Sequence, residues 1–171
     1  MDEQMISKAV EAVIREMTSG HDTKYHQCKC KKHKMTLALA KALTERVEQK
    51  ATEIGLPVVI AISDQAGRIT AVHCMDDALI ASYDIAVNKA FTAASVKMST
   101  AELGKLSQPG GTLYGIQHTN GGKIVVFGGG ELLKVDGKII GAIGVSGGSA
   151  EQDSMLAAYG VEILEEVISC L

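Results

Sequence analysis

The chain contains no tryptophan, and aromatic residues make up only 4% of its 171 positions. Without large rings, a hydrophobic core has to be built from aliphatic side chains, with methionine as an adaptable filler. Hydrophobic residues nevertheless account for 46% of the chain, which is enough for such a core. The length therefore predicts one folded domain of ordinary size together with an extension.

Strong charge and long apolar runs are also missing. The net charge is −3, and no basic stripe runs through the main part of the chain, which argues against nucleic-acid binding. No apolar run approaches the roughly 18 residues that span a bilayer, and no secretory signal pattern is evident. Four cysteines do not form the framework of a disulfide-rich secreted domain. We expect a cytoplasmic protein that binds neither nucleic acid nor membrane.

Residues 1–17 have the period of an amphipathic helix, followed by a polar stretch over residues 18–34. The apolar positions of this helix are Met5, Ile6, Ala9, Val10, Val13, Ile14 and Met17. A helix this short is marginal alone in water, so it needs a partner surface. The arrangement predicts a docking helix on a tether; the alternative is that the helix packs on its own domain or on a sister subunit.

Residues 35–171 show alternating helical and strand patterns. We expect helices over residues 35–55, 77–97, 99–106 and 150–169, and strands over 58–63, 69–74, 123–127, 130–135 and 138–145. Asp136-Gly137 between two apolar runs is a strong hairpin signal. The order α-β-β-α-α-β-β-β-α predicts an α+β domain with an antiparallel five-stranded sheet and flanking helices, preceded by the N-terminal amphipathic helix.

A glycine-rich turn from Gly144 to Gly148 leads into a helix with a capping-box pattern at Ser149 and Gln152. The positive end of a helix favours an anionic group. Ser146, Gly147 and Gly148 are therefore candidates for holding a carboxylate, propionate or phosphate, while tight packing of strand against helix explains them equally well. The pattern G-x-S-x-G does not indicate a hydrolase, because no histidine follows it, and the turn lacks the lysine of a phosphate loop.

A second cluster, of soft ligands, lies in the tether. His26, Cys28, Cys30 and His33 are side chains that suit zinc, iron, copper or haem iron. Neighbouring lysines favour the thiolate form of the cysteines. We expect a transition-metal site here, completed within one chain or between subunits; the alternative is a basic tether with incidental cysteines and histidines.

Single residues elsewhere have both a binding and a structural interpretation. His73 ends a strand and could ligate haem iron or be a hydrogen-bonded structural histidine. His73 and Met75 should share one face of the sheet, with Cys74 on the other. Lys89, in an alanine-rich helix, could contact a ligand or form a salt bridge. His118 lies in an expected loop, where ligands often occur. No residue pair defines a catalytic reaction.

Three stretches in this order resemble the GlcG/HbpS-like family, also called the haem-degrading-domain family, which includes the C-terminal domain of PduO proteins. They are VVIAISDQAGRITAVHCMDD (58–77), NKAFTAA (88–94) and VDGKIIGAIGVSGGSAEQD (135–153). Cys74 stands where the family commonly has arginine. The resemblance implies tetrapyrrole binding, to haem or a corrinoid, and a homo-oligomer. Residues 1–17 resemble the encapsulation peptides of bacterial microcompartments, which implies a shell or cargo partner.

Three functions follow from these observations. The first is a tetrapyrrole-binding protein, which the resemblance of residues 1–17 associates with a microcompartment. The second is an enzyme that acts on a small anionic metabolite held by the glycine turn, with Lys89, Asp136 or Asp153 assisting. The third is a non-catalytic cargo or assembly factor that docks through residues 1–17.

Overall fold

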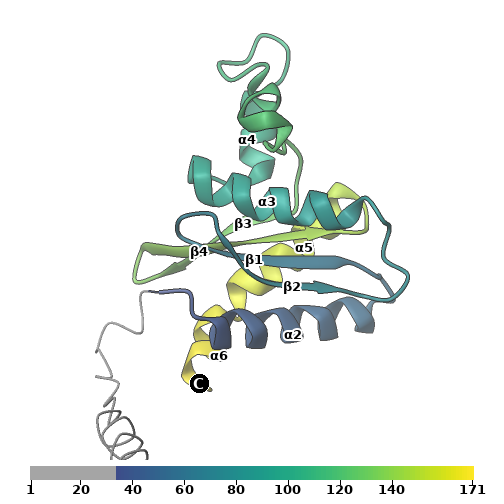
Figure 1. The fold of residues 1–171 in the computed structure, drawn as a ribbon, viewed down its shortest axis with the longest axis vertical. Coiled ribbons are helices and arrows are strands. Elements are labelled where there is room, and N and C mark those ends of the chain that lie inside the picture. The colour runs from purple at the N-terminus through teal and green to yellow at the C-terminus, as the bar shows by residue number, and fades with distance from the viewer. Residues whose placement is uncertain (1–33) are drawn as a thin grey trace, which may run out of the picture. The chain divides into compact units, whose positions relative to one another are not determined.

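The computed structural model describes residues 34–171 of the chain (Figure 1). Its helices are α2 (Leu37–Glu53), α3 (Ser82–Val96), α4 (Thr100–Leu106), α5 (Ala150–Glu162) and α6 (Leu164–Ser169), with short turns η2 (Ile116–His118) and η3 (Asn120–Gly122). Its strands are β1 (Val59–Asp64), β2 (Ile69–Cys74), β3 (Gly130–Val135) and β4 (Lys138–Ser146). The expected α+β class is confirmed.

The strands form one antiparallel sheet in the order β2-β1-β4-β3. Helix α3 covers one face of the sheet, and α2, α5 and α6 cover the other (Figure 1). The larger core, between the sheet and α2 and α5, consists of aliphatic side chains such as Leu43, Ile60 and Leu156. The face under α3 is packed by small residues, Val59, Ala61, Ala86 and Ala90. The alanines allow a close approach of helix and sheet.

The prediction of five strands is wrong by one, because residues 123–127 do not join the sheet of the described residues. Ile124 and Val125 are buried, which explains the apolar run. The Val125 N–H donates to Thr92 Oγ1 at 3.0 Å, so a side chain replaces a neighbouring strand as its partner. Side-chain burial looks alike in both arrangements, so the sequence pattern could not distinguish them.

Local signals at the element ends agree with the structure. Asp136 and Gly137 both have positive φ, of 49° and 73°, as a two-residue primed turn requires. Capping boxes start α4 at Ser99 and α5 at Ser149. The expected last helix is divided at Ile163 into α5 and α6, and α3 begins at Ser82 rather than at residue 77.

Between α4 and residue 123 the chain forms a lobe that projects beyond the layers, seen in green in Figure 1. It contains η2 and η3 and carries exposed Tyr114 and His118. Among residues 34–171, no helix is long and apolar enough to cross a membrane.

Candidate functional site

Two charged residues are buried among the described residues, Lys89 on α3 and Asp153 on α5. The Lys89 side chain is fully buried, and its Nζ donates to Asp153 Oδ2 at 2.6 Å and to the Val145 carbonyl at 2.7 Å. The face of the Phe127 ring lies 5.0 Å from the same nitrogen, within the range of a cation–π contact. Lys89 thus forms a buried salt bridge, which is the second of the two interpretations that the sequence allowed.

The glycine run 128–130 makes room for this side chain. Asp153 belongs to α5, on the opposite side of the sheet from α3, so Lys89 has to pass the start of β3. A Cβ on Gly129 would lie 2.6 Å from Lys89 Nζ, and one on Gly130 would lie 2.6 Å from Thr100 Cγ2. Gly129 also has a φ of 112°, which side chains disfavour. The glycines thus let one ion pair join the two helical layers.

Asp153 also organises the glycine-rich turn before α5. Its Oδ1 accepts from the Gly148 N–H at 2.9 Å, and Gln152 Oε1 accepts from the Ser149 N–H at 2.9 Å. The turn does present N–H groups to carboxylate and amide oxygens, but these belong to the protein itself. An external anion at Gly148 would have to displace the Asp153 carboxylate.

Ser146 and Gly147 lie inside this arrangement rather than at its surface. Ser146 is buried, and its hydroxyl is 3.3 Å from the Ser82 hydroxyl. A Cβ on Gly147 would lie 2.4 Å from the Pro57 carbonyl oxygen. Both positions fit the packing alternative for the turn.

Burial lowers the pKa of Lys89 from its ordinary value, and the hydrogen bond and charge of Asp153 oppose that effect. Burial removes water from around the ammonium and so penalises its charged form. This effect on the Lys89 pKa is larger than the opposing effect of Asp153. The paired carboxylate keeps the ion pair in place.

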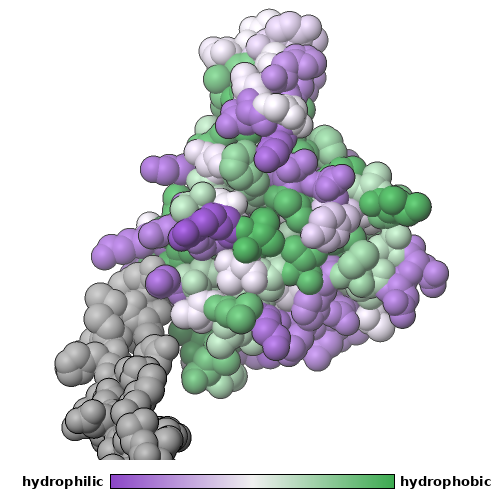
Figure 2. Space-filling view, in the orientation of Figure 1, coloured by the Kyte–Doolittle hydropathy of each residue, from purple (hydrophilic) through white to green (hydrophobic). Residues whose placement is uncertain are grey.

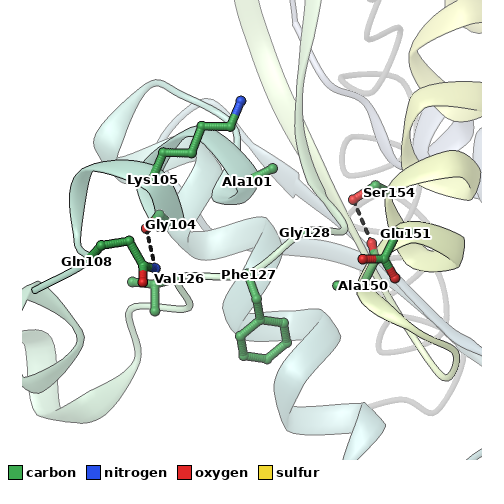
Figure 3. Close-up of a pocket in the computed structure, with 10 residues that line it drawn as sticks. All are labelled: Ala101, Gly104, Lys105, Gln108, Val126, Phe127, Gly128, Ala150, Glu151 and Ser154. Carbon is green, nitrogen blue, oxygen red and sulfur yellow. Dashed lines mark hydrogen bonds between the residues drawn. The ribbon is translucent and has the colours of Figure 1, made fainter.

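An open groove of about 500 Å³ lies beside the ion pair (Figure 3). One wall is α4, at Gly104 and Lys105, and the other is the N-terminal part of α5, at Glu151 and Ser154. Phe127 projects from the segment between them. Phe127 is 46% exposed, so one aromatic ring covers the buried ammonium and faces solvent. The groove is mostly apolar with one cation and one anion at its rim.

His73 takes a hydrogen-bonded position on β2. Its Nδ1 lies 2.5 Å from Glu48 Oε2 of α2, and its side chain is 29% exposed. The expected alternation holds, since Met75 packs on the larger core while Cys74 is exposed. A carboxylate on Nδ1 fixes the imidazole orientation and leaves Nε2 as the outer nitrogen, as in many metal-ligating histidines.

His118 lies at the end of η2, on the projecting lobe, and is exposed. In the part of the chain that the structure describes, its ring has no hydrogen-bond or ion-pair partner. The structure does not bring His73, Lys89 and His118 together into one cluster: His73 faces α2, Lys89 points to α5, and His118 stands on the lobe.

The candidate metal ligands His26, Cys28, Cys30 and His33 lie outside the described residues. Within residues 34–171, no group of three or more His, Cys, Asp or Glu side chains is placed to hold a metal ion. Glu48 and Phe127 are not among the site residues predicted from the sequence. The glycine run directly after Phe127 was a sequence signal that this position lies in a close-packed site. Nothing in the sequence connected Glu48 to His73.

Among proteins of known sequence, the chain is 46% identical over 133 residues to an uncharacterised 15.0 kDa protein of Citrobacter freundii from the dhaT–dhaS intergenic region, covering 94% of it and 78% of this chain. It is 44% identical over 119 residues to the corrinoid adenosyltransferase PduO of Salmonella typhimurium, which covers 70% of this chain. The chain spans only 35% of that PduO.

Solved structures agree with this relationship. The Klebsiella pneumoniae protein ORFY matches with a TM-score of 0.75 and 43% identity, over 77% of this chain and 90% of that one. A PduOC:haem complex matches with a TM-score of 0.72 and 40% identity, over 75% of this chain and 94% of that one. The model of the family described as haem-degrading protein HbpS-like matches residues 35–162. The chain belongs to the HbpS-like haem-degrading protein family.

Proposed function

We propose that this chain is a tetrapyrrole-binding domain and that its ligand is haem. The observation that carries the proposal is the shared fold with the PduOC:haem complex, at 40% identity over nearly the whole of that chain. The corrinoid activity in the name of PduO belongs to a protein of which this chain spans about a third, so it supports a corrinoid less directly.

Two imidazoles of the described residues fit a haem iron, which proteins commonly hold through histidine. His118 is exposed and has no partner within residues 34–171. His73 is oriented by Glu48 and keeps its outer nitrogen available. We take His118 as the first candidate because no internal hydrogen bond has to rearrange for it to bind iron. Bound haem would supply redox and ligand-binding chemistry at its iron.

The enzyme alternative has weaker support. Lys89 and Asp153 satisfy each other at 2.6 Å and are buried, so neither is placed to act on a substrate. The groove beside Phe127 could hold a small metabolite, but its walls contain no paired acid and base. Haem binding agrees better than a metabolite-converting enzyme with the similarity to the PduOC:haem complex and to the HbpS-like family.

The test is a titration of the full chain with ferric haem, followed by the Soret band and compared with His118→Ala and His73→Ala. Loss or a wavelength shift of the band in one variant identifies the axial ligand. The double variant His26→Ala/His33→Ala tests the two tether histidines in the same way. If wild type gives no saturable Soret band, the proposal is wrong. If both single variants bind like wild type, the two named ligands are wrong.

We also propose that the tether binds a transition metal through Cys28 and Cys30, assisted by His26 or His33. The support is the density of ligands among lysines that favour thiolate. Zinc titration of wild type against Cys28→Ala/Cys30→Ala tests this, and equal stoichiometry and affinity would contradict it. Binding should weaken below neutral pH, because the ligands must lose protons.

We further propose that residues 1–17 dock the protein to a microcompartment shell or cargo protein. The support is the amphipathic spacing of this segment, which lies outside the family match at residues 35–162. Fusing residues 1–17 to a fluorescent protein should give punctate localisation in cells that assemble microcompartments. Charge substitutions at Val10 and Val13 should disperse it; diffuse fluorescence of the unaltered fusion would count against the idea.

A further inference from the structure

The groove between α4 and α5 that Phe127 lines, here the Phe127 groove, has a fixed backbone on both sides of this ring. A Cβ on Gly104 of α4 would lie 2.4 Å from the Val126 carbonyl oxygen. One on Gly128 would lie 2.2 Å from Ser154 Oγ of α5. Contacts this close require residues without a side chain. The segment that carries Phe127 is therefore wedged between the two walls, which fixes the position of the ring.

The two faces of the Phe127 ring have different surroundings. Lys89 Nζ lies 5.0 Å from the ring centroid, and the Phe127 side chain is nevertheless 46% exposed. Because Lys89 is fully buried, the exposed surface lies on the other side of the ring. An ammonium draws the π electrons of a ring toward itself, which leaves the opposite face poorer in electrons. Such a face stacks most favourably on a planar ring that is rich in electrons.

Small residues leave room around this ring. Ala101 and Ala150 line the Phe127 groove, whose volume of about 500 Å³ is in the range of small-molecule sites. In Figure 2, hydrophilic and intermediate residues cover most of the projecting lobe that follows α4. A half-exposed phenylalanine is unusual beside such a surface. The groove therefore offers an aromatic platform with space for a small organic molecule.

Each wall of the Phe127 groove carries one charge at the rim (Figure 3). Lys105 of α4 forms no ion pair within residues 34–171, so its ammonium is free to pair with an anion. Glu151 of α5 accepts hydrogen bonds from the Ser149 side chain and from its own backbone N–H, which lower the pKa of its carboxyl. Glu151 is therefore ionised at neutral pH. A ligand that lies across the groove meets a cation on one wall and a hydrogen-bond acceptor on the other.

Haem iron has no ordinary ligand in this groove. Proteins hold haem iron through histidine, cysteine, methionine or tyrosine, and none of these is among the described residues that line it. His73 faces α2, and His118 stands on the projecting lobe. The lining of the Phe127 groove therefore suits an aromatic molecule without a metal.

We propose that the Phe127 groove binds an electron-rich aromatic carboxylate, at a site distinct from that of haem. The ring of the ligand stacks on Phe127, and its carboxylate pairs with Lys105. An N–H or O–H group at the opposite end of the ligand donates a hydrogen bond to Glu151. The glycine contacts hold the platform in place before the ligand binds, which reduces the ordering that binding requires.

The first test is a titration of the full chain with para-aminobenzoate, which carries a carboxylate and an amine at opposite ends of an electron-rich ring. The chain has no tryptophan, so the fluorescence anisotropy of this probe can be followed over a low protein background. It should rise to saturation at one probe per chain. Three competitors should bind at least about fivefold more weakly: benzoate lacks the amine, aniline lacks the carboxylate, and para-nitrobenzoate has an electron-poor ring. No saturable rise, or equal competition by para-nitrobenzoate, would overturn the proposal.

The second test uses variants of the groove. Phe127→Leu should weaken binding of the probe about tenfold. Tyr114→Leu, which removes an exposed aromatic residue from the projecting lobe, should bind like wild type. Lys105→Gln should weaken binding about threefold, with Lys138→Gln as the matched control for an exposed lysine. Ala101→Phe fills the groove without touching the buried ion pair, and it should abolish binding while circular dichroism and thermal unfolding show a folded domain.

A haem titration of the same variants separates this proposal from that of haem binding. Phe127→Leu should keep the Soret titration of wild type, because neither candidate axial histidine lines the groove. A parallel loss of probe and haem binding in this variant would make the groove part of the haem site and overturn the proposal of a distinct one. Wild-type affinity for the probe in both Phe127→Leu and Ala101→Phe would also overturn it, whether or not the chain binds haem.

Discussion

Lys89 and Asp153 illustrate how a single contact can determine the residues around it. The pair is buried between two helical layers, and the backbone beside it is restricted to glycine at residue 129. Removing one member of such a pair is expected to be costly, because it leaves an uncompensated buried charge. A new side chain at residue 129 that pushed Lys89 away from Asp153 should lower the free energy of unfolding by a comparable amount.

Gly129→Ala tests this at the point of closest approach. The new Cβ would lie 2.6 Å from Lys89 Nζ and 2.7 Å from the Val145 carbonyl, on a backbone with φ of 112°. We expect a loss of about 3 kcal/mol or more in the free energy of unfolding, measured by urea denaturation. Gly137→Ala is the control, because it also has positive φ but nothing within 4 Å. Its cost should be about 1 kcal/mol; equal losses would show that the ion pair is not displaced.

The lowered pKa of Lys89 gives a second prediction at this scale. Its ordinary pKa is 10.5, and burial lowers the folded-state pKa. Between the two values the unfolded chain binds more protons, so this group makes the free energy of unfolding rise with pH. We expect the stability difference between wild type and Lys89→Met/Asp153→Asn to shift in favour of wild type as pH rises toward 10.5. Lys138→Met, which alters an exposed lysine, should show no such trend.

At the scale of elements, α5 depends on its first turn. Ser149 accepts from the Gln152 N–H, and Gln152 accepts from the Ser149 N–H, which completes a capping box. The same turn places Asp153 toward Lys89. The cap therefore contributes both to the helix and to the direction of the buried carboxylate.

Ser149→Ala should lower the free energy of unfolding by about 1 kcal/mol, because it removes one hydrogen bond of the cap. Ser149→Asp should restore most of this loss, since aspartate is also a good N-cap residue. Urea denaturation of the three proteins measures the effect. An alanine variant as stable as wild type would mean that Asp153 and Gly148 alone hold the turn.

At the scale of the molecule, the hydrophobic core of the described residues spans the family match at residues 35–162 and continues into α6. Its buried members run from Met35 to Val167 and involve α2, α5, α6 and the sheet. The described residues make these core contacts with one another.

Deleting residues 1–17 should therefore leave the domain folded. We expect a loss below about 1 kcal/mol, which corresponds to a melting-temperature shift of no more than about 4 °C for a chain of this size. Thermal unfolding followed by circular dichroism measures this shift. A fall of many degrees would mean that the segment is part of the core, as in the alternative interpretation of its amphipathic pattern.

The sequence by itself determined the features that depend on neighbouring residues. The Asp136-Gly137 turn, the caps at Ser99 and Ser149, and the alternation of His73 and Cys74 on β2 all agree with the structure. Each rests on a local requirement of backbone conformation or on the period of a strand, so a few adjacent residues are sufficient to specify it. Together with the ordered motifs, they were enough for the α+β class.

Only the tertiary structure decided which distant residues meet. It excluded residues 123–127 from the sheet, because Thr92 occupies the Val125 N–H where a strand would have to bond. It paired Lys89 with Asp153, 64 residues later, and His73 with Glu48, 25 residues earlier. It also placed β2 at one edge of the sheet that residues 34–171 form. Such pairings depend on how layers stack, and the apolar pattern of a segment is the same whichever partner it meets.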